Sequence, residues 1–386
     1  MAASERVKPD PSMWLPLLDT YELTTLPGDT VLRGTLRPDL RVDSPEVTEA
    51  LETWPGQAHV SADEGGVDLV LVYQIKERVR PGLTVHLVLF LATLVTTLGS
   101  GALMDGVDPF RTRFFEYGRV DLPYPSGLDL LRLSRGASFA LPFLGVLLAH
   151  EMSHFFAARK HGVRASLPYF IPFPPYFSLI GSLGAFIRLR GPTVRRASLF
   201  DIGASGPLAS FVVSLPLLVL GLLWSQPIVG EVSLATPFVI RFMGDPVWLG
   251  NGLATWMLAA MFGPAPVGET LILLHPFALA GWLGLFVTAL NLLPLGQLDG
   301  GHILYAMGPR IHLRVARLFM LALIPLGFLW WGWWAWAVLV YVIHRGRVGH
   351  PRVIQPGPDV GRRRTVVGWI LVLTFLLTLV PVPIQL

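Results

Sequence analysis

The feature that most constrains the fold is an apolar segment, residues 141–160, which reads LPFLGVLLAHEMSHFFAARK. It is long enough to cross a bilayer as a helix, yet it carries His150, Glu151 and His154 within its apolar run. Ionisable groups at membrane depth cost several kcal/mol unless they are paired or bound to a metal. Residues four apart share one helix face, so both imidazoles can hold one metal ion with Glu151 beside it. The segment therefore predicts a membrane helix that carries a functional polar site.

The pattern HExxH in this segment is typical of zinc hydrolases. Neutral imidazoles bind Zn²⁺ without cancelling its charge, an open coordination position keeps a water molecule, and a nearby carboxylate takes the proton of that water. Three fixed residues alone are a weak signal, and the lipid-length setting strengthens it. The chain has no cysteine, so a metal must take nitrogen and oxygen ligands.

The composition defines the class of protein. The 386-residue chain is 52% hydrophobic and only 15% charged, which excludes an ordinary soluble enzyme and predicts an α-helical polytopic membrane protein. Its net charge is a modest +4, and its arginines cluster at the edges of apolar segments, which indicates membrane topology and no nucleic-acid partner. About six spans are predicted, at residues 83–104, 136–158, 199–224, 271–293, 319–343 and 366–380. The span at 319–343 can also be a hairpin broken at 325–327, and the sequence leaves both interpretations open.

Residues 1–80 differ in kind from residues 81–386, which form the membrane domain. Alternating residues predict strands at 30–36 and 67–75, and a Ser-Pro entry signal predicts a helix at 44–54. We therefore expect a small soluble α+β domain, with no secretory signal peptide before it. Lys76, Arg78 and Arg80 precede the first span, and positive flanks predict that this domain is cytoplasmic.

The segment 167–190 is apolar throughout but contains Pro168, Pro172, Pro174 and Pro175. Each proline removes a backbone donor, so a regular spanning helix is excluded. Irregular backbone at membrane depth occurs where it is buried in protein or lines a watery cavity, which predicts a re-entrant loop or β-hairpin near the site. Residues 178–187 could offer a strand edge to an extended substrate. A hairpin at the membrane surface without substrate contact is the alternative, and the sequence does not decide between them.

A second polar stretch, NLLPLGQLDGGH at residues 291–302, supplies what HExxH lacks. A catalytic zinc ion normally takes three protein ligands and a water molecule, and Asp299 is the candidate third ligand because a carboxylate is otherwise expensive in an apolar chain. The predicted topology brings both motifs to the same membrane face, in the half of the span at 136–158 that is nearer the cytoplasm. We expect His302 to orient a neighbour or cap the following helix.

Three motifs together carry a family resemblance. HEMSH, the sequence GASGP at residues 203–207 and NLLPLGQLDGGH resemble the site-2 protease family (M50) of intramembrane zinc metalloproteases. The run HEMSHFFAARKHGVRASLPYFIPFPP further resembles the bacterial and chloroplast branch related to the ethylene-dependent gravitropism protease. The resemblance covers about residues 85–305, and no PDZ-like insertion is evident between the two polar motifs.

The resemblance implies a role for each matching residue. His150, His154 and Asp299 would bind one Zn²⁺ per chain, with Glu151 as the general base. Asn291 would help to bind substrate or the developing oxyanion, and an interhelical hydrogen bond is its alternative role.

The predicted function is hydrolysis of peptide bonds in or near the transmembrane segments of membrane proteins. The partners are such substrates and the lipid bilayer, and a homo-oligomer is left open. We expect a multi-pass protein of the bacterial cytoplasmic membrane with its active site towards the cytoplasm. A metal-binding transporter and a non-catalytic membrane scaffold remain as alternatives, although a scaffold could lose Glu151 freely.

Overall fold

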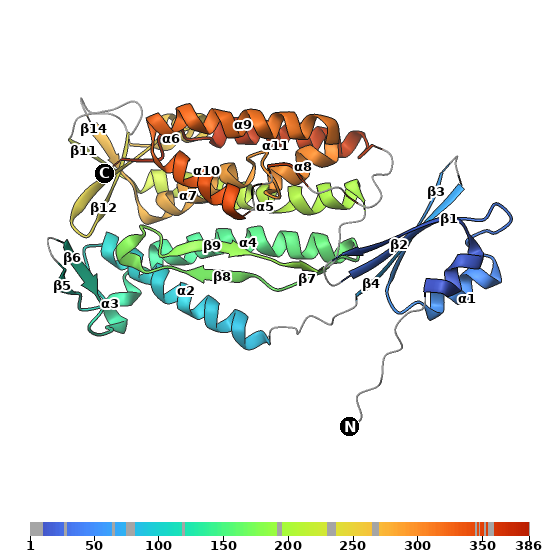
Figure 1. Ribbon diagram of the computed structural model, residues 1–386. Coiled ribbons are helices and arrows are strands. Elements are labelled where there is room, and N and C mark those ends of the chain that lie inside the picture. The colour runs from blue at the N-terminus through green and yellow to red at the C-terminus, as the bar shows by residue number, and fades with distance from the viewer. Residues whose placement is uncertain are drawn as a thin grey trace, which may run out of the picture. The chain divides into compact units, whose positions relative to one another are not determined.

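The computed structural model describes most of the chain and divides it into two compact units, Met1–Arg80 and Pro81–Leu386 (Figure 1). The described residues are 11–26, 29–63, 66–74, 82–117, 120–190, 195–229, 237–264, 270–343, 346, 348–350, 353 and 359–385. The basic residues used to orient the first span, Lys76, Arg78 and Arg80, lie outside these ranges. Each unit is described by itself.

The first unit is a four-stranded antiparallel sheet with a helix. Its elements are η1 (Pro11–Leu17), β1 (Leu18–Leu26), β2 (Asp29–Leu36), α1 (Pro45–Thr53), β3 (Gln57–Asp63) and β4 (Gly66–Gln74). The strand order is β1-β2-β4-β3, and β2 and β4 occupy the two segments whose alternation predicts strands. Trp14 and Trp54 meet edge to face at 6.4 Å over Leu69 and Leu71, which form the core of the sheet with Val47 of α1.

The second unit is built on apolar helices. Among the described residues, four helices are long and apolar enough to cross a membrane, namely α2 (Leu83–Met104), α4 (Ala137–Lys160), α5 (Arg196–Leu223) and α9 (Pro309–Leu329). The shorter helices are α3 (Leu130–Ser134), α6 (Leu253–Phe262), α7 (Pro276–Asn291), α8 (Asp299–Met307), α10 (Gly332–Ile343) and α11 (Arg362–Thr378). Helix α5 packs against both α4 and α7. Gly221 of α5 lies so close to Ala278 of α7 that a side chain would collide with its backbone, the close approach that small residues permit between helices in lipid.

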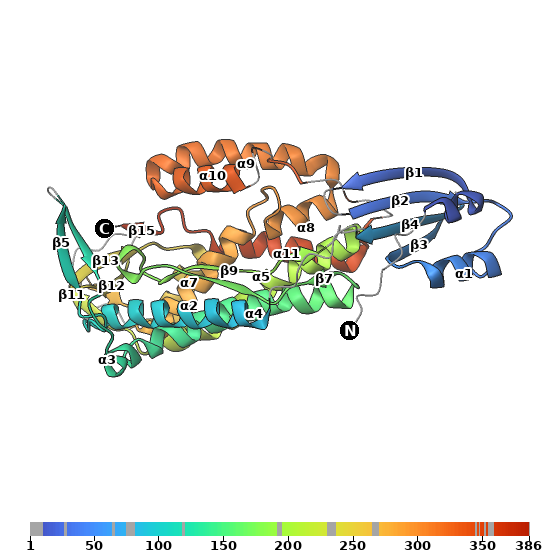
Figure 2. The same cartoon turned by 60° about the horizontal axis from the view of Figure 1, so that its bottom comes forward.

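Strands fill the connections between these helices. They form the hairpin β5 (Arg113–Tyr117) with β6 (Val120–Tyr124), the pair β7 (Arg164–Ala165) with β10 (Leu189–Arg190), and the hairpin β8 (Tyr169–Pro172) with β9 (Ser182–Phe186). A five-stranded sheet has the order β11-β14-β12-β13-β15, from β11 (Gln226–Val229), β12 (Phe238–Phe242), β13 (Asp245–Leu249), β14 (Thr270–Leu273) and β15 (Ile384–Gln385). Both views place this sheet and the β5–β6 hairpin at the same end of the unit (Figures 1 and 2).

The helical frame agrees with a membrane protein, and three segments differ in detail from the predicted spans. Residues 271–293 begin in β14 and continue as the 16-residue helix α7, because Pro276 starts a helix well inside the apolar run. Residues 319–343 form two helices, α9 and α10, that meet at residues 330–331 instead of 325–327. Residues 226–250, between the predicted spans at 199–224 and 271–293, contain β11, β12 and β13. The count of six spans stays a prediction.

The proline-rich segment contains no spanning helix among its described residues, in agreement with its composition. Residues 167–190 form β8, the short 3-10 helix η2 (Pro175–Phe177), β9 and β10. The hairpin bends sharply at Gly181, whose φ of +66° suits a residue without a side chain. Whether this segment is re-entrant in a bilayer stays a prediction.

Candidate metal centre

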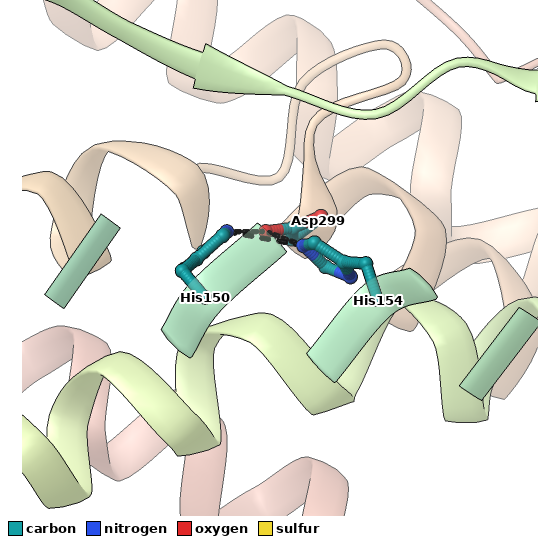
Figure 3. Close-up of side chains that lie close together, drawn as sticks. All are labelled: His150, His154 and Asp299. Atoms are coloured by element: carbon teal, nitrogen blue, oxygen red, sulfur yellow. Dashed lines mark hydrogen bonds and ion pairs between the residues drawn. The ribbon is translucent and has the colours of Figure 1, made fainter. Parts of the chain in front are cut away.

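Helix α4 brings the two histidines of the HExxH pattern to one position. His150 and His154 are 4% and 6% exposed, and their Nε2 atoms lie 3.0 Å apart. Asp299, the first residue of α8, points at them from the opposite side (Figure 3). Its Oδ2 lies 3.2 Å from the Nε2 of His150 and 3.3 Å from the Nε2 of His154. The three donor atoms converge on one point from segments about 150 residues apart in the chain.

A tight turn delivers Asp299 to this point. Helix α7 ends at Asn291, and the chain reverses through Gly296, whose φ is +51°. Gly300 and Gly301 lie against the backbone of this turn, where a Cβ on Gly301 would come within 2.5 Å of the Gly296 carbonyl oxygen. The glycines of the LDGG sequence therefore let α8 begin directly beneath α4.

The far sides of both imidazoles are held by hydrogen bonds from α5. The Nδ1–H of His154 donates to the carbonyl oxygen of Ile202 at 2.7 Å. The Nδ1 of His150 lies 3.1 Å from the hydroxyl of Ser210, which in turn lies 2.8 Å from the hydroxyl of Thr288 on α7. Partners of this kind fix the tautomer and turn the Nε2 lone pair towards a metal. The sequence pattern did not predict these partners.

Gly206 of the GASGP sequence leaves room for both imidazoles. A Cβ at this position would lie 2.8 Å from the Nε2 of His150 and closer still to the Nε2 of His154. Helix α5 thus contacts the donor atoms through its backbone at Gly206. This contact is the physical reason for a glycine at this position of the motif.

Glu151 and Asn291 line one cavity next to the donor atoms, which we call the site cavity. It has a volume of about 340 Å³, and its walls include apolar residues of α7, Ser182–Ala185 of the β8–β9 hairpin, Met104 of α2 and Ile240 of β12. Glu151 is 7% exposed and lies within hydrogen-bonding reach of the Ile187 backbone. The Nδ2 of Asn291 lies 3.4 Å from the Nε2 of His150. The five residues singled out by the sequence are therefore neighbours in space.

His302 does not join this group. Its Nδ1 lies 2.7 Å from the Nε2 of His350, and among the described residues the side chains placed to share one metal ion are His150, His154 and Asp299. His302 thus fits the expectation that it orients a neighbour.

The donor set suits zinc. Nitrogen and carboxylate oxygen are normal zinc ligands, and ligands placed tetrahedrally at about 2.0–2.1 Å from zinc lie about 3.3 Å from each other. The observed separations of 3.0–3.3 Å agree with that value without any rearrangement of the chain.

Comparison with known proteins agrees with the geometry. Residues 138–326 match the family model for peptidase family M50. The probable chloroplastic zinc metalloprotease EGY1 of Arabidopsis thaliana is 30% identical over 329 residues, which cover 80% of this chain and 56% of that protein. The probable chloroplastic zinc metalloprotease EGY2 of Arabidopsis thaliana is 32% identical over 232 residues, which cover 58% of this chain and 38% of that protein. No solved structure matches the chain.

The similarity has a defined extent. The chain spans about half the length of the first curated relatives it matches, EGY1 from Arabidopsis thaliana and from rice. The residues that match the family model, 138–326, include both polar motifs, and zinc is the metal that the relatives' names imply. The chain therefore carries a peptidase family M50 domain over residues 138–326 and is homologous to zinc metalloproteases of the site-2 protease family.

Proposed function

We propose that this protein is a zinc metallopeptidase that hydrolyses peptide bonds of membrane proteins within the bilayer. One observation carries the proposal: a carboxylate oxygen from α8 converges with two imidazole nitrogens on α4, a helix that is long enough to cross a membrane. Beside them Glu151 and Asn291 line a largely apolar cavity. A polar site of this composition at membrane depth favours chemistry over a structural role.

Each site residue takes a defined role in this proposal. The Nε2 atoms of His150 and His154 and the Oδ2 of Asp299 would hold the zinc ion. When bound, zinc supplies a Lewis acid that polarises a carbonyl and acidifies water. Glu151 accepts the proton of the attacking water and donates a proton to the leaving amine. The side-chain amide of Asn291 donates a hydrogen bond to the oxyanion.

The site cavity indicates the form of the substrate. A volume of about 340 Å³ has no room for a helix, which is about 10 Å across, so the substrate would enter as an unwound segment. Strand β9 lines this cavity and pairs only with β8 among the described residues, which leaves its second edge for an extended chain. The alternative, a hairpin without substrate contact, predicts that substitutions at Leu183, an exposed residue of β9 in the cavity lining, leave cleavage unchanged.

Location and assembly belong to the same proposal. We infer an integral membrane protein with transmembrane proteins as substrates and residues 1–80 as a separate domain. The cytoplasmic position of that domain, the cytoplasmic orientation of the site and a bacterial membrane stay predictions, and the relatives' names, which are chloroplastic, do not favour a bacterial location. A homo-oligomer is likewise untested.

The first experiment measures zinc per chain, by elemental analysis in detergent, for the wild type, His154→Ala and Asp299→Ala. We expect about one zinc ion in the wild type and a loss in both folded variants. Wild-type protein without zinc after metal supplementation, or Asp299→Ala with as much zinc as the wild type, would refute the three-ligand site.

The second experiment separates catalysis from transport and from passive binding. Purified protein in liposomes is given single-span membrane proteins, and both cleavage and zinc flux are measured for the wild type and Glu151→Gln. Cleavage that disappears in Glu151→Gln while zinc remains bound supports the peptidase. Zinc flux that is independent of Glu151, without any cleavage, would establish the transporter instead.

A further inference from the structure

The five-stranded sheet has two faces with different surroundings. Phe238, Ile240, Val247 and Leu249 point into the core of the membrane unit. The strand register places alternate residues on the opposite face, since Val239 pairs with both Trp248 and Leu273, and neighbours across a sheet share a face. That face lines a cavity of about 1180 Å³, which we call the sheet chamber. Its sheet residues include Val239, Arg241, Trp248, Leu271, Leu273 and Gln385.

The sheet chamber lies at one end of the membrane unit. Its other walls come from the end of α2, the beginning of α4 and the beginning of α7, represented by Met104, Ser138 and Pro276. On helix α4, Ser138 precedes His150 by twelve residues, a distance of about 18 Å at 1.5 Å per residue. An extended chain covers that distance with five to six residues at about 3.3 Å each.

The sheet chamber and the site cavity share a wall. Met104, Ile240 and Leu279 line both of them, so the two spaces are neighbours. Met104 is the last residue of α2 and only partly buried, and its unbranched side chain adapts readily to a passing ligand. The sheet chamber is thus adjacent to the site where the substrate would be cleaved.

The size and charge of the sheet chamber indicate its occupant. A volume of about 1180 Å³ exceeds the roughly 300–1,000 Å³ of small-ligand pockets and suits a length of polypeptide. Its lining combines apolar side chains with Arg241, which has no ion-pair partner among the residues described. Asp105, also in the lining, is paired with Arg135 at 2.8 Å. The sheet chamber therefore favours an extended segment that carries a carboxylate.

We propose that the sheet chamber binds the extended segment flanking the substrate's transmembrane helix, with Arg241 paired to a carboxylate of that segment. This inference rests on the proposed peptidase function and names a second contact with the same substrate. The part of the sheet chamber at Ser138 lies about five to six extended residues from the cleaved bond, by the distance along α4. The bound carboxylate comes either from an acidic side chain or from the end of a chain that has already been trimmed.

The test compares synthetic transmembrane peptides that share one apolar segment and differ in the flank. Three flanks are long: the first has an internal glutamate, the second has a free terminal carboxylate as its only acid, and the third is amide-capped and has no acid. The fourth flank is short and ends within three residues of the cleaved bond. The enzymes are the wild type, Arg241→Gln, Leu273→Trp, which puts a bulkier side chain into the lining of the sheet chamber, and Arg113→Gln as control. Arg113 lies exposed on β5 at the same end of the unit, outside the lining of the sheet chamber.

We expect Arg241→Gln to lower kcat/KM about tenfold for flanks with a carboxylate, in keeping with loss of one hydrogen bond to a charged group. The short and the amide-capped flanks should be cleaved equally by both enzymes, and Arg113→Gln should resemble the wild type throughout. Leu273→Trp should lower kcat/KM for every long flank and spare the short one. Preference for glutamate or for the free terminus identifies the source of the carboxylate. Unchanged ratios between long and short flanks in both variants would overturn the proposal.

A binding measurement separates this proposal from the proposed function. Zinc-loaded Glu151→Gln carries a photocrosslinker at Trp248 and is exposed to the long carboxylate flank and to the short one. Crosslinking of the long flank alone supports the sheet chamber, even if wild-type protein cleaves none of the peptides and the peptidase proposal fails. Equal crosslinking of both peptides, or of neither, would overturn the sheet chamber even if cleavage is observed.

Discussion

Gly206→Ala adds a single methyl group beside the donor atoms. The new carbon would lie 2.8 Å from the Nε2 of His150, while ordinary contacts begin at 3.4 Å, so that nitrogen must withdraw by about 0.6 Å. The Nε2 of His154 is closer still and must move further. Zinc sites tolerate ligand displacements of about 0.2 Å. We therefore expect zinc affinity to fall at least about 100-fold, since even the loss of an outer hydrogen bond costs 10- to 100-fold.

The assay is zinc competition with a coloured chelator, together with a thermal melt in detergent. Gly145→Ala is the matched control, because Gly145 lies on α4 with nothing within 4 Å of its Cβ direction. Alanine exceeds glycine in helix propensity by about 1 kcal/mol, so both substitutions favour their helices. The melting temperature of the metal-free Gly145→Ala control should therefore not be lower than that of the wild type. Wild-type zinc affinity in Gly206→Ala would show that α5 does not limit the donor positions and would refute the reasoning.

Further substitutions test the neighbouring residues. Glu151→Gln should keep zinc and lose cleavage by at least about 100-fold, so zinc loss in that variant would contradict a pure base role. Asn291→Ala should lower kcat by about 10²- to 10³-fold, with zinc content unchanged, if the Asn291 amide donates a hydrogen bond to the oxyanion. An unchanged kcat with a lower melting temperature would show that Asn291 serves helix packing instead. Ser210→Ala should weaken zinc binding by about 10- to 100-fold, measured by the same competition, whereas equal affinity would show that His150 needs no partner. Removal of zinc by a chelator should abolish cleavage and zinc addition should restore it, while chelator-resistant cleavage would exclude a zinc mechanism.

The donor residues were accessible to sequence reasoning because each has a strong physical signature. His150 and His154 are spaced by one helical turn in an apolar segment, where unpaired ionisable groups are costly. Asp299 follows a glycine-rich turn in a chain with few carboxylates at membrane depth. These arguments concern single residues and local periodicity, and they predicted which side chains lie together in the structure.

The partners of the imidazoles have no comparable signature. Ile202 acts through its backbone carbonyl, which every residue possesses, and Ser210 resembles the other small residues of α5. Ile202 and Ser210 face the imidazoles because of the rotation of α5 about its axis, and packing against α4 and α7 sets that rotation. Sequence periodicity identifies an apolar helix without fixing which residue meets which neighbour.

The five-stranded sheet was missed for a different reason. Its strands are four or five residues long, apart from the two-residue β15, which comes from the end of the chain to pair with β13. Such pairing is non-local, and short apolar runs do not distinguish a strand from part of a membrane helix. For the same reason β14 was predicted as the beginning of a span. The sheet chamber, which depends on this pairing, could only be found in the assembled structure.

The assembled structure also connects helix packing with the chemistry of the site. Lipid supplies no hydrophobic force to drive helices together, so close packing of small residues must hold α4, α5 and α7. Gly206 and Gly284 provide that closeness, with Gly284 leaving no room for a Cβ beside Ser214 of α5. The same closeness brings the hydroxyls of Ser210 and Thr288 within hydrogen-bonding distance behind His150. A substitution that separates α5 from α7 should therefore disturb the tautomer of His150 as well as stability, so packing variants here are expected to lose zinc before they unfold.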